Sequence, residues 1–173
     1  ADRTVSATTA WEGRFLSVKL DGTWEYVSRV GGVSAAVIVA IDDGHVILVE
    51  QYRMPLGQRC LELPAGLVGD ETAGEAVEIA AARELEEETG YRADRIETIG
   101  FFHASPGMVS EGFTLVRAHG LTKVGPGGGV AGENITVHRI PLATLPDFVA
   151  AKRAEGVAMD VKLLLLLGQP LLR

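Results

Sequence analysis

The sequence has little cysteine, no excess of positive charge and no long apolar run, and each shortage excludes a class of protein. Cys60 is the single cysteine among 173 residues, so an internal disulfide is excluded and a reducing, cytoplasmic environment is expected. The formal net charge of −7 disfavours a general nucleic-acid binder, which requires a basic face. The leucine run at residues 163–167 is too short to span a bilayer, so no membrane segment is expected.

The sequence also lacks histidines with the spacing of a metal site and lacks internal repeats, and no secretory leader is expected. The four histidines have no spacing typical of a metal site and are expected to be structural or surface residues. Residues 1–10 are polar, lack the apolar run of a secretory signal, and are expected to be frayed or partly ordered. No period of 20–50 residues recurs, and the one biased tract is glycine-rich, at residues 125–132. What remains is a globular chain long enough to bury about two-thirds of its unfolded surface.

An acidic helix is the most informative feature that is present. It is predicted over residues 72–89, with Gly90 as its C-cap, and its apolar stripe of Ile79, Ala82 and Leu85 is expected to dock on a sheet. At about 100° per residue, another stripe carries three carboxylates, those of Glu84, Glu87 and Glu88. A divalent cation would turn their mutual repulsion into ligation, and oxygen-only ligands suit magnesium or manganese. A glutamate run is more often a solvated helix face, so this stripe alone decides nothing.

The spacing of the fixed residues around this helix is specific. It reads Gly69, five residues, Glu75, seven residues, Arg83-Glu84-Leu85, one residue, Glu87-Glu88, one residue, Gly90-Tyr91. With average residue usage, so many matches arise by accident on the order of once in a million chains of this length. This pattern is the complete box of the Nudix hydrolases, and the chain resembles that family. One departure concerns the first glycine: in the similar subfamily it belongs to a Pro64-Ala65-Gly66-Leu67 segment, so either Gly66 or Gly69 opens the box.

Two further motifs resemble the ADP-ribose pyrophosphatase branch of the family. They are the Gln51-Tyr52-Arg53 run followed by residues 62–66, Glu-Leu-Pro-Ala-Gly, and Pro106, which stands sixteen residues after Gly90. The resemblance implies that Arg53, Glu62, Pro106 and Glu111 lie near the substrate. Taken alone, Arg53 and Glu62 are more often a surface ion pair, and a proline is common in any turn.

The resemblance implies an α/β fold, an α/β/α sandwich with a mixed sheet and an added N-terminal antiparallel hairpin. Residues 1–32 are expected to form the hairpin subdomain and residues 33–173 the hydrolase domain. Strands are predicted at 13–20, 23–30, 34–41, 45–51, 95–103, 113–118 and 134–140, and helices at 145–154 and 160–167. In the similar subfamily the extra sheet is exchanged or packed across a dimer, so a homodimer is expected. Trp24 and Tyr26 alternate onto one face of the hairpin, for core or subunit packing or, alternatively, stacking on a nucleotide base.

The family resemblance also implies roles for the site residues. Glu84, Glu87 and Glu88 would hold Mg²⁺, with Mn²⁺ as a possible substitute, and the Ala65 carbonyl is a further candidate ligand. Arg83 would orient the glutamates, and Glu75 would support the loop and the metal shell from behind. Glu133 is the candidate general base, with Glu111 and Glu87 as alternatives. The glycine-rich tract before Glu133 is either a floppy connector or a mobile lid that brings Glu133 over the site.

The function that this resemblance implies is magnesium-dependent hydrolysis of the diphosphate bond in a nucleoside diphosphate sugar. ADP-ribose or a related compound is the expected substrate, and a nucleoside monophosphate and a sugar phosphate are the products. A preference for GDP-mannose or another sugar nucleotide is the alternative within the enzyme class. The rival from another class is a non-catalytic module that senses a nucleotide sugar, but such a module would be expected to have lost box glutamates, and none is lost here.

Overall fold

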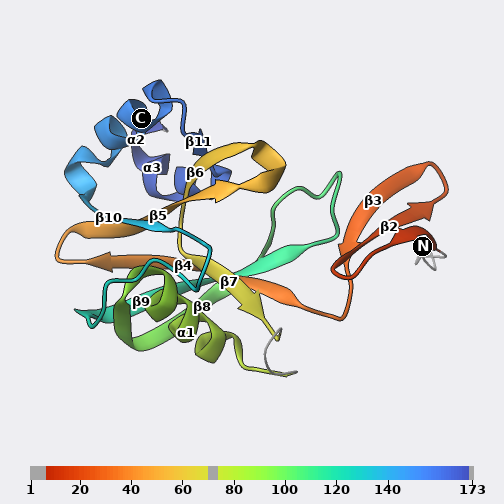
Figure 1. Ribbon diagram of the computed structural model, residues 1–173, viewed down its shortest axis with the longest axis horizontal. Helices are drawn as coiled ribbons and strands as arrows, with labels where there is room; N and C mark the ends of the chain where they lie inside the picture. Colours follow the sequence, from red (N-terminus) through yellow and green to blue (C-terminus); the bar gives the residue numbers. More distant parts are fainter. Residues whose placement is uncertain (1–6, 70–73, 172–173) are drawn as a thin grey trace.

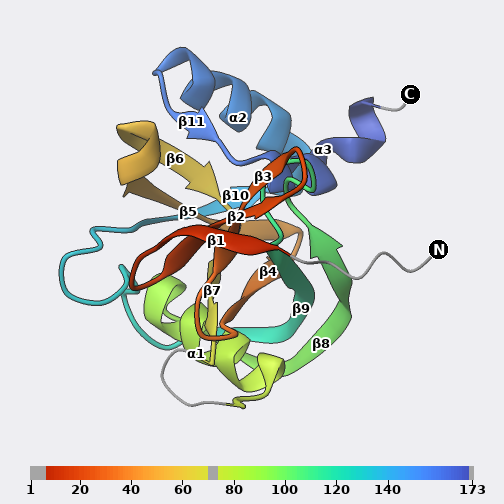
Figure 2. The ribbon, with the colours of Figure 1, turned by 90° about the vertical axis from the view of Figure 1, so that its right-hand side faces the viewer.

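The apolar segments in the middle of the chain form the central strands of a mixed sheet that is covered by helices on both faces (Figures 1 and 2). The computed structural model describes residues 7–69 and 74–171. The strands of the large sheet are β4 (Ser34–Asp42), β5 (His45–Arg53), β6 (Gln58–Glu62), β7 (Ala65–Val68), β8 (Tyr91–His103), β9 (Gly112–Lys123), β10 (Thr136–Pro141) and β11 (Ala158–Met159). The helices are α1 (Val77–Thr89), α2 (Leu145–Ala154) and α3 (Leu164–Leu171), with short 3-10 turns η1 (Met54–Leu56), η2 (Leu142–Thr144) and η3 (Val161–Leu163).

The order of the strands explains where the sheet opens. The order is β11-β6-β5-β4-β9-β8, with β10 beside β5 and β7 beside β4. The β4–β9 and β6–β11 pairs are parallel and the other pairs are antiparallel. β4 and β5 pair at their hairpin end, at Ile41–Val46 and Asp42–His45. Further along, β4 pairs with β7 while β5 pairs with β6, so the two central strands separate.

Two apolar cores lie on the two faces of this sheet. On β4 the side chains alternate, so that Ile38 packs toward α1 and Val37 packs toward α2 and α3. Leu85 of α1 and Leu145 of α2 are almost fully buried in these two cores. Burying a leucine contributes about 2 kcal/mol, so each helix is held mainly by its packing. This arrangement confirms the expected α/β/α architecture with a mixed sheet.

Helix α1 differs from the prediction at its beginning and in its buried face. It begins at Val77 after an extended Ala76, five residues later than predicted, and Thr72 lies outside the described residues. It ends as predicted, because Gly90 has φ of 70° and donates its N–H to the Glu86 carbonyl. The predicted apolar stripe was right at Leu85, which is fully buried, but wrong at Ile79, which is 62% exposed. The sheet buries Ala80 and Ala81 together with Leu85.

The N-terminal residues form a separate three-stranded antiparallel sheet of β1 (Thr8–Glu12), β2 (Leu16–Asp21) and β3 (Trp24–Arg29). The hairpin between β2 and β3 confirms the prediction, with Gly22 and Thr23 in the turn and Gly22 at φ of 63°. β1 was not predicted, because residues 8–10 were expected to be frayed, whereas they pair with β2. Figure 1 shows this sheet standing to one side of the main body.

The helices of the C-terminal part complete the fold. The helix predicted over residues 160–167 is divided: Asp160 is extended and caps η3, and α3 follows. The predicted helix at residues 145–154 is confirmed as α2. Among the described residues, no helix combines the length and apolarity needed to cross a membrane.

Candidate active site

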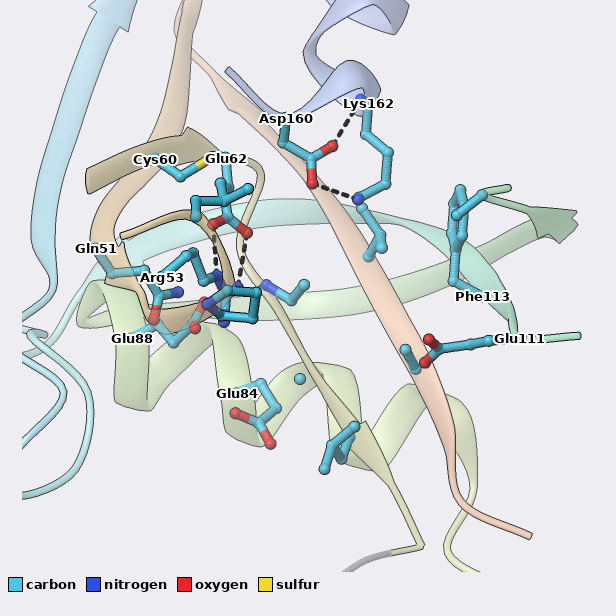
Figure 3. Close-up of a pocket in the computed structure, with 18 of the residues that line it drawn as sticks. Gln51, Arg53, Cys60, Glu62, Glu84, Glu88, Glu111, Phe113, Asp160 and Lys162 are labelled. Carbon is cyan, nitrogen blue, oxygen red and sulfur yellow. Dashed lines mark hydrogen bonds and ion pairs between the residues drawn. The ribbon is translucent and has the colours of Figure 1, made fainter. Parts of the chain in front are cut away.

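A pocket of about 690 Å³ lies where β4 and β5 separate (Figure 3). Residues of β3, β4, β5, β6, β7, β9 and β11 line it. The other lining residues come from η1, α1, the turn between β8 and β9, the loop that carries Glu133, and the segment that follows β11. The split between the two central strands exposes residues that would otherwise lie inside a continuous sheet. Topology therefore creates the pocket, and side chains of the separated strands supply its chemistry.

Two glutamates of α1 form the acidic end of the pocket. Glu84 lies directly against Gly66 of β7, where a Cβ would stand 2.0 Å from the Glu84 Cδ atom. A side chain at Gly66 would therefore occupy the space that the carboxylate fills. Glu88 accepts a hydrogen bond from the Ala65 N–H at 3.1 Å. Gly69 has φ of 86°, so both candidate box glycines have a local role, but Gly66 is the one in contact with Glu84.

The electrostatics of Glu88 favour a cation in this end of the pocket. Glu88 is 6% exposed, and burial raises its pKa to about 8. The nearby charges of Glu84 and Glu133 raise this pKa further, while the Ala65 N–H and Arg53 act in the opposite direction. A positive charge beside Glu88 would restore its ionised form, which is the form that ligates a metal.

The charges that line the pocket are unbalanced. Six carboxylates line it, and three cations do so: Glu62, Glu84, Glu88, Glu111, Glu133 and Asp160 against Arg29, Arg53 and Lys162. Each cation already lies beside a carboxylate, Arg29 with Glu111 at 2.5 Å and Lys162 with Asp160 at 2.5 Å. An anionic ligand would therefore be repelled unless further positive charge accompanied it. Oxygen donors of this kind suit a hard divalent cation.

Arg83 lies among the other box glutamates. Its Nη1 atom is 3.0 Å from Glu84 Oε1 and 3.8 Å from Glu87 Oε2, and its Nη2 atom is 3.4 Å from Glu75 Oε2. Glu87 lines a second, smaller pocket of about 470 Å³ rather than the first. In the described part of the chain, no three His, Cys, Asp or Glu side chains are gathered closely enough to hold a metal ion. The three-glutamate ligand set stays a prediction that requires Glu87 to turn from Arg83.

Arg53 and Glu62 form the rigid centre of the pocket. Arg53 Nε donates to Glu62 Oε1 at 2.6 Å, and Nη2 donates to Oε2 at 2.7 Å. The Glu62 side chain is 7% exposed, so this is a part-buried bidentate pair rather than a solvated surface contact. The pair fixes the plane of the guanidinium and leaves its other N–H donors for a ligand.

The glycine-rich tract contains no helix or strand, as predicted, but it is docked against the end of α1. Gly128 and Gly129 donate their N–H groups to the Glu88 and Glu87 carbonyls at 2.8 and 3.0 Å. Gly127 has φ of 70° and comes so close that a Cβ would lie 2.4 Å from the Thr89 carbonyl carbon. The loop thus satisfies carbonyls that α1 leaves unpaired, and it fixes the place where Glu133 enters the pocket.

The structure gathers most of the predicted site residues but not all of them. Ala65, Glu84, Glu88, Arg53, Glu62, Glu111 and Glu133 all line the pocket. Of the described residues, Trp24, Tyr26, Pro106, Arg83 and Glu87 are not among those that line it. Trp24 is 58% exposed on the N-terminal sheet, and Pro106 lies in the turn between β8 and β9.

Sequence reasoning missed part of the lining. The unpredicted residues include Gln51, Cys60, Phe113, Asp160 and Lys162. Gln51 could have been found, because it belongs to the motif that contains Arg53. Asp160 and Lys162 gave only the signal of a helix cap before an apolar run, which indicates no ligand.

The fold and the acidic pocket define the class of this protein. The family model for the NUDIX domain matches residues 32–145, and the chain belongs to that family. The solved structure titled "Crystal structure of ADP compounds hydrolase" superimposes with a TM-score of 0.69 at 25% identity, covering 95% of this chain and 91% of the other.

Relatives from other organisms are similar to this chain in sequence. An ADP-sugar pyrophosphatase from Mus musculus is 36% identical over 157 residues, which are 81% of this chain and 70% of that protein. A methanol dehydrogenase activator from Bacillus methanolicus is 34% identical over 131 residues, 70% of this chain and 68% of that one. The resemblance read from the box and from the Gln-Tyr-Arg motif is therefore confirmed at the level of family and subgroup.

Proposed function

We propose that this protein is a magnesium-dependent hydrolase of the diphosphate bond in ADP-ribose or a related nucleoside diphosphate sugar. The products are a nucleoside monophosphate and a sugar phosphate. The observation that carries the proposal is the pocket in which Glu84 and Glu88 of the NUDIX box meet the Arg53–Glu62 pair. Similarity to an ADP-sugar pyrophosphatase and to an ADP compounds hydrolase supports the substrate class.

The chain's own residues divide the work of hydrolysis. Arg53, held in plane by Glu62, presents its remaining N–H donors to a phosphoryl oxygen. Glu84, Glu88 and the Ala65 carbonyl would hold a divalent cation. Glu87 would become a further ligand if its side chain turned away from Arg83. When bound there, such a cation would offset the negative charge of the diphosphate oxygens and would lower the pKa of the attacking water. Manganese would substitute for magnesium, since both accept oxygen ligands.

The reaction consumes one water. Its oxygen forms a bond to one phosphorus, the bridging P–O bond breaks, and the bridging oxygen leaves on the other phosphate. The proton of the water passes to a carboxylate, and we assign this role to Glu133. It lines the pocket, its charge acts on Glu88, and its Oε2 atom is held at 2.8 Å by the Val130 N–H. Glu111 and Glu87 are the alternative bases.

A substrate panel tests this proposal. Purified protein is incubated with magnesium and each of ADP-ribose, GDP-mannose, UDP-glucose, NADH and oxidised dGTP, and alkaline phosphatase reports newly exposed monophosphates. We expect selective release from a nucleoside diphosphate sugar, abolished by EDTA and restored by magnesium. Release from GDP-mannose instead of ADP-ribose would keep the reaction but assign the preference to guanine and mannose. Binding without any release would favour a sensing module in place of an enzyme.

We also propose that the protein is a cytoplasmic homodimer with two structural parts, residues 1–32 and 33–173. A free, buried Cys60 suits a reducing compartment. The N-terminal sheet exposes a tryptophan on each face, Trp11 at 59% and Trp24 at 58%. Exposed apolar side chains that gather on one part of a surface mark an association site, and a second copy of the chain is the partner we assign. Trp24 and Tyr26 share one face of this sheet and would belong to the subunit contact if the second copy covers that face.

A further inference from the structure

The wall of the pocket opposite the acidic glutamates comes from the segment that follows β11. Figure 3 shows Asp160 and Lys162 across the pocket from Glu84, with Arg53 and Glu62 between them. This placement gives the pocket two ends of different character. One end gathers carboxylates, and the other presents a carboxylate and an ammonium group side by side.

Backbone contacts fix the position of this wall. β11 pairs in parallel with β6, and the Asp160 N–H donates to the Leu61 carbonyl at 3.0 Å. Asp160 Oδ1 accepts from the Lys162 N–H at 2.7 Å, and Oδ2 lies 2.5 Å from Lys162 Nζ. Both side chains are less than one-fifth exposed. A pair held in this way is pre-organised, because little conformational freedom remains to be lost on binding.

The chemistry of the wall selects the kind of group that it can receive. The carboxylate and the ammonium cancel in charge, so a further phosphate would gain little attraction here. Lys162 keeps donors beyond the one directed at Asp160, and each carboxylate oxygen keeps acceptor capacity. The Phe113 ring has Lys162 Nζ 5.7 Å from its centroid and the Phe102 ring centroid at 6.1 Å, so protein groups already neighbour it. Adjacent donors and acceptors match a vicinal diol better than an aromatic base.

We infer that Asp160 and Lys162 form the subsite for the hydroxyl groups of the terminal sugar, the group released as its phosphate. This inference rests on the proposed function, because it assumes a diphosphate placed between Glu84, Glu88 and Arg53. It assigns specificity to the segment that follows β11, whereas hydrolysis is assigned to the glutamates of α1, Arg53 and Glu133. The two residues therefore discriminate between terminal sugars without acting on the reacting atoms.

Kinetics with a matched pair of substrates test the subsite. ADP-ribose carries the terminal sugar, whereas the P2-methyl ester of ADP keeps the nucleoside and the diphosphate but has a methyl group in place of that sugar. For Lys162→Met and for Asp160→Asn we expect KM for ADP-ribose to rise about tenfold or more. KM for the methyl ester should stay within about twofold of the parent value. Lys162→Arg, which restores a donor, should recover part of the ADP-ribose affinity.

Control variants distinguish a sugar subsite from a general effect on the pocket. Arg153→Met removes a cation from the exposed face of α2 and should change neither KM. Equal increases in both KM values would place the pair at the nucleoside or the diphosphate, and unchanged values would remove it from recognition; either result overturns the inference. If Lys162→Met fails to fold, Asp160→Asn keeps an acceptor for the Lys162 N–H and still decides the question. If the parent hydrolyses neither compound, the proposed function fails, and calorimetric binding of the same two compounds to parent and variants tests the subsite independently.

Discussion

At Glu88, burial and two neighbouring carboxylates oppose the charge that metal ligation requires, and the pKa rises to about 8. Glu88→Gln keeps the shape of the side chain and an acceptor for the Ala65 N–H, but it removes the ligand charge. We expect turnover to fall on the order of a thousandfold or more. The melting temperature should be unchanged or higher, because an uncompensated buried carboxyl group is removed. Steady-state rates and a thermal melt measure both effects.

The control for this variant is on the same helix. Glu86 is exposed and pairs with Arg92 at 2.9 Å, on a side of α1 that does not line the main pocket. Glu86→Gln should leave turnover within about twofold of the parent, since exposed ion pairs contribute little. Near-parental turnover for Glu88→Gln would contradict its assignment as a metal ligand.

The pKa of Glu50 is lowered, whereas that of Glu88 is raised. The lowered pKa of Glu50 leads to a prediction on stability in acid. Burial alone would raise its pKa, but hydrogen bonds from Arg59, Lys152 and His138 outweigh burial and lower the pKa to about 2. The folded-state pKa is therefore below the unfolded value of 4.5, so the stabilisation is complete above pH 4.5 and is lost as the pH falls toward 2. We expect the free energy of unfolding to decline across this window.

Urea denaturation between pH 7 and pH 2 measures this decline. In Glu50→Gln the decline should be shallower, and stability at pH 7 should be lower by about 3 kcal/mol, because Arg59 and Lys152 lose a buried partner. Parallel acid profiles for parent and variant would show that another group controls acid stability.

At the level of elements, the glycine-rich loop and the end of α1 form one unit. Gly127 needs a positive φ and lies against the Thr89 and Glu88 backbone, whereas Gly125 has open space at its Cβ position and no such φ. Gly127→Ala should therefore cost about 2 kcal/mol or more, because the loop must leave the α1 carbonyls. Since Glu133 enters the pocket from this loop, turnover should fall as well.

Gly125→Ala is the matched control, two residues away in the same loop. It should change the melting temperature and turnover little, since alanine fits there. If the two variants have the same melting temperature and turnover, the docking of this loop on α1 does not contribute to stability or activity. Backbone amide exchange at Gly128 and Gly129, which donate to the α1 carbonyls, would report the docking directly.

The same elements show what the sequence could predict. The C-terminal half of α1 was predictable, because the box spacing and a glycine cap are local signals. Its beginning at Val77 and the exposure of Ile79 were not, since the position of the sheet decides which face of a short alanine-rich helix is buried. Asp160 and Lys162 reach the pocket through the pairing of β11 with β6, a contact distant in sequence that no local pattern encodes.

At the scale of the whole molecule, the N-terminal sheet is joined to the body through the turn between β8 and β9. The Val27 N–H donates to the Met108 carbonyl at 3.0 Å, and Arg29 pairs with Glu111 at the margin of the pocket. A change in the packing of this sheet would therefore reach a residue that lines the site. Subunit association and substrate affinity are coupled through that contact if a second copy covers the sheet.

Light scattering after gel filtration tests this association, and we expect a mass of two chains. The register places Trp11 and Trp24 on opposite faces, because their partners Val18 and Asp21 are three residues apart. Trp11→Ser and Trp24→Ser, made separately, identify the covered face by which of them gives monomers, since losing a central aromatic contact costs about 2 kcal/mol or more. Ile79→Ser removes an equally exposed apolar residue from α1 and should leave the dimer intact. A monomeric parent would refute the dimer, whereas a monomeric variant with raised KM would show that the pocket depends on the partner copy.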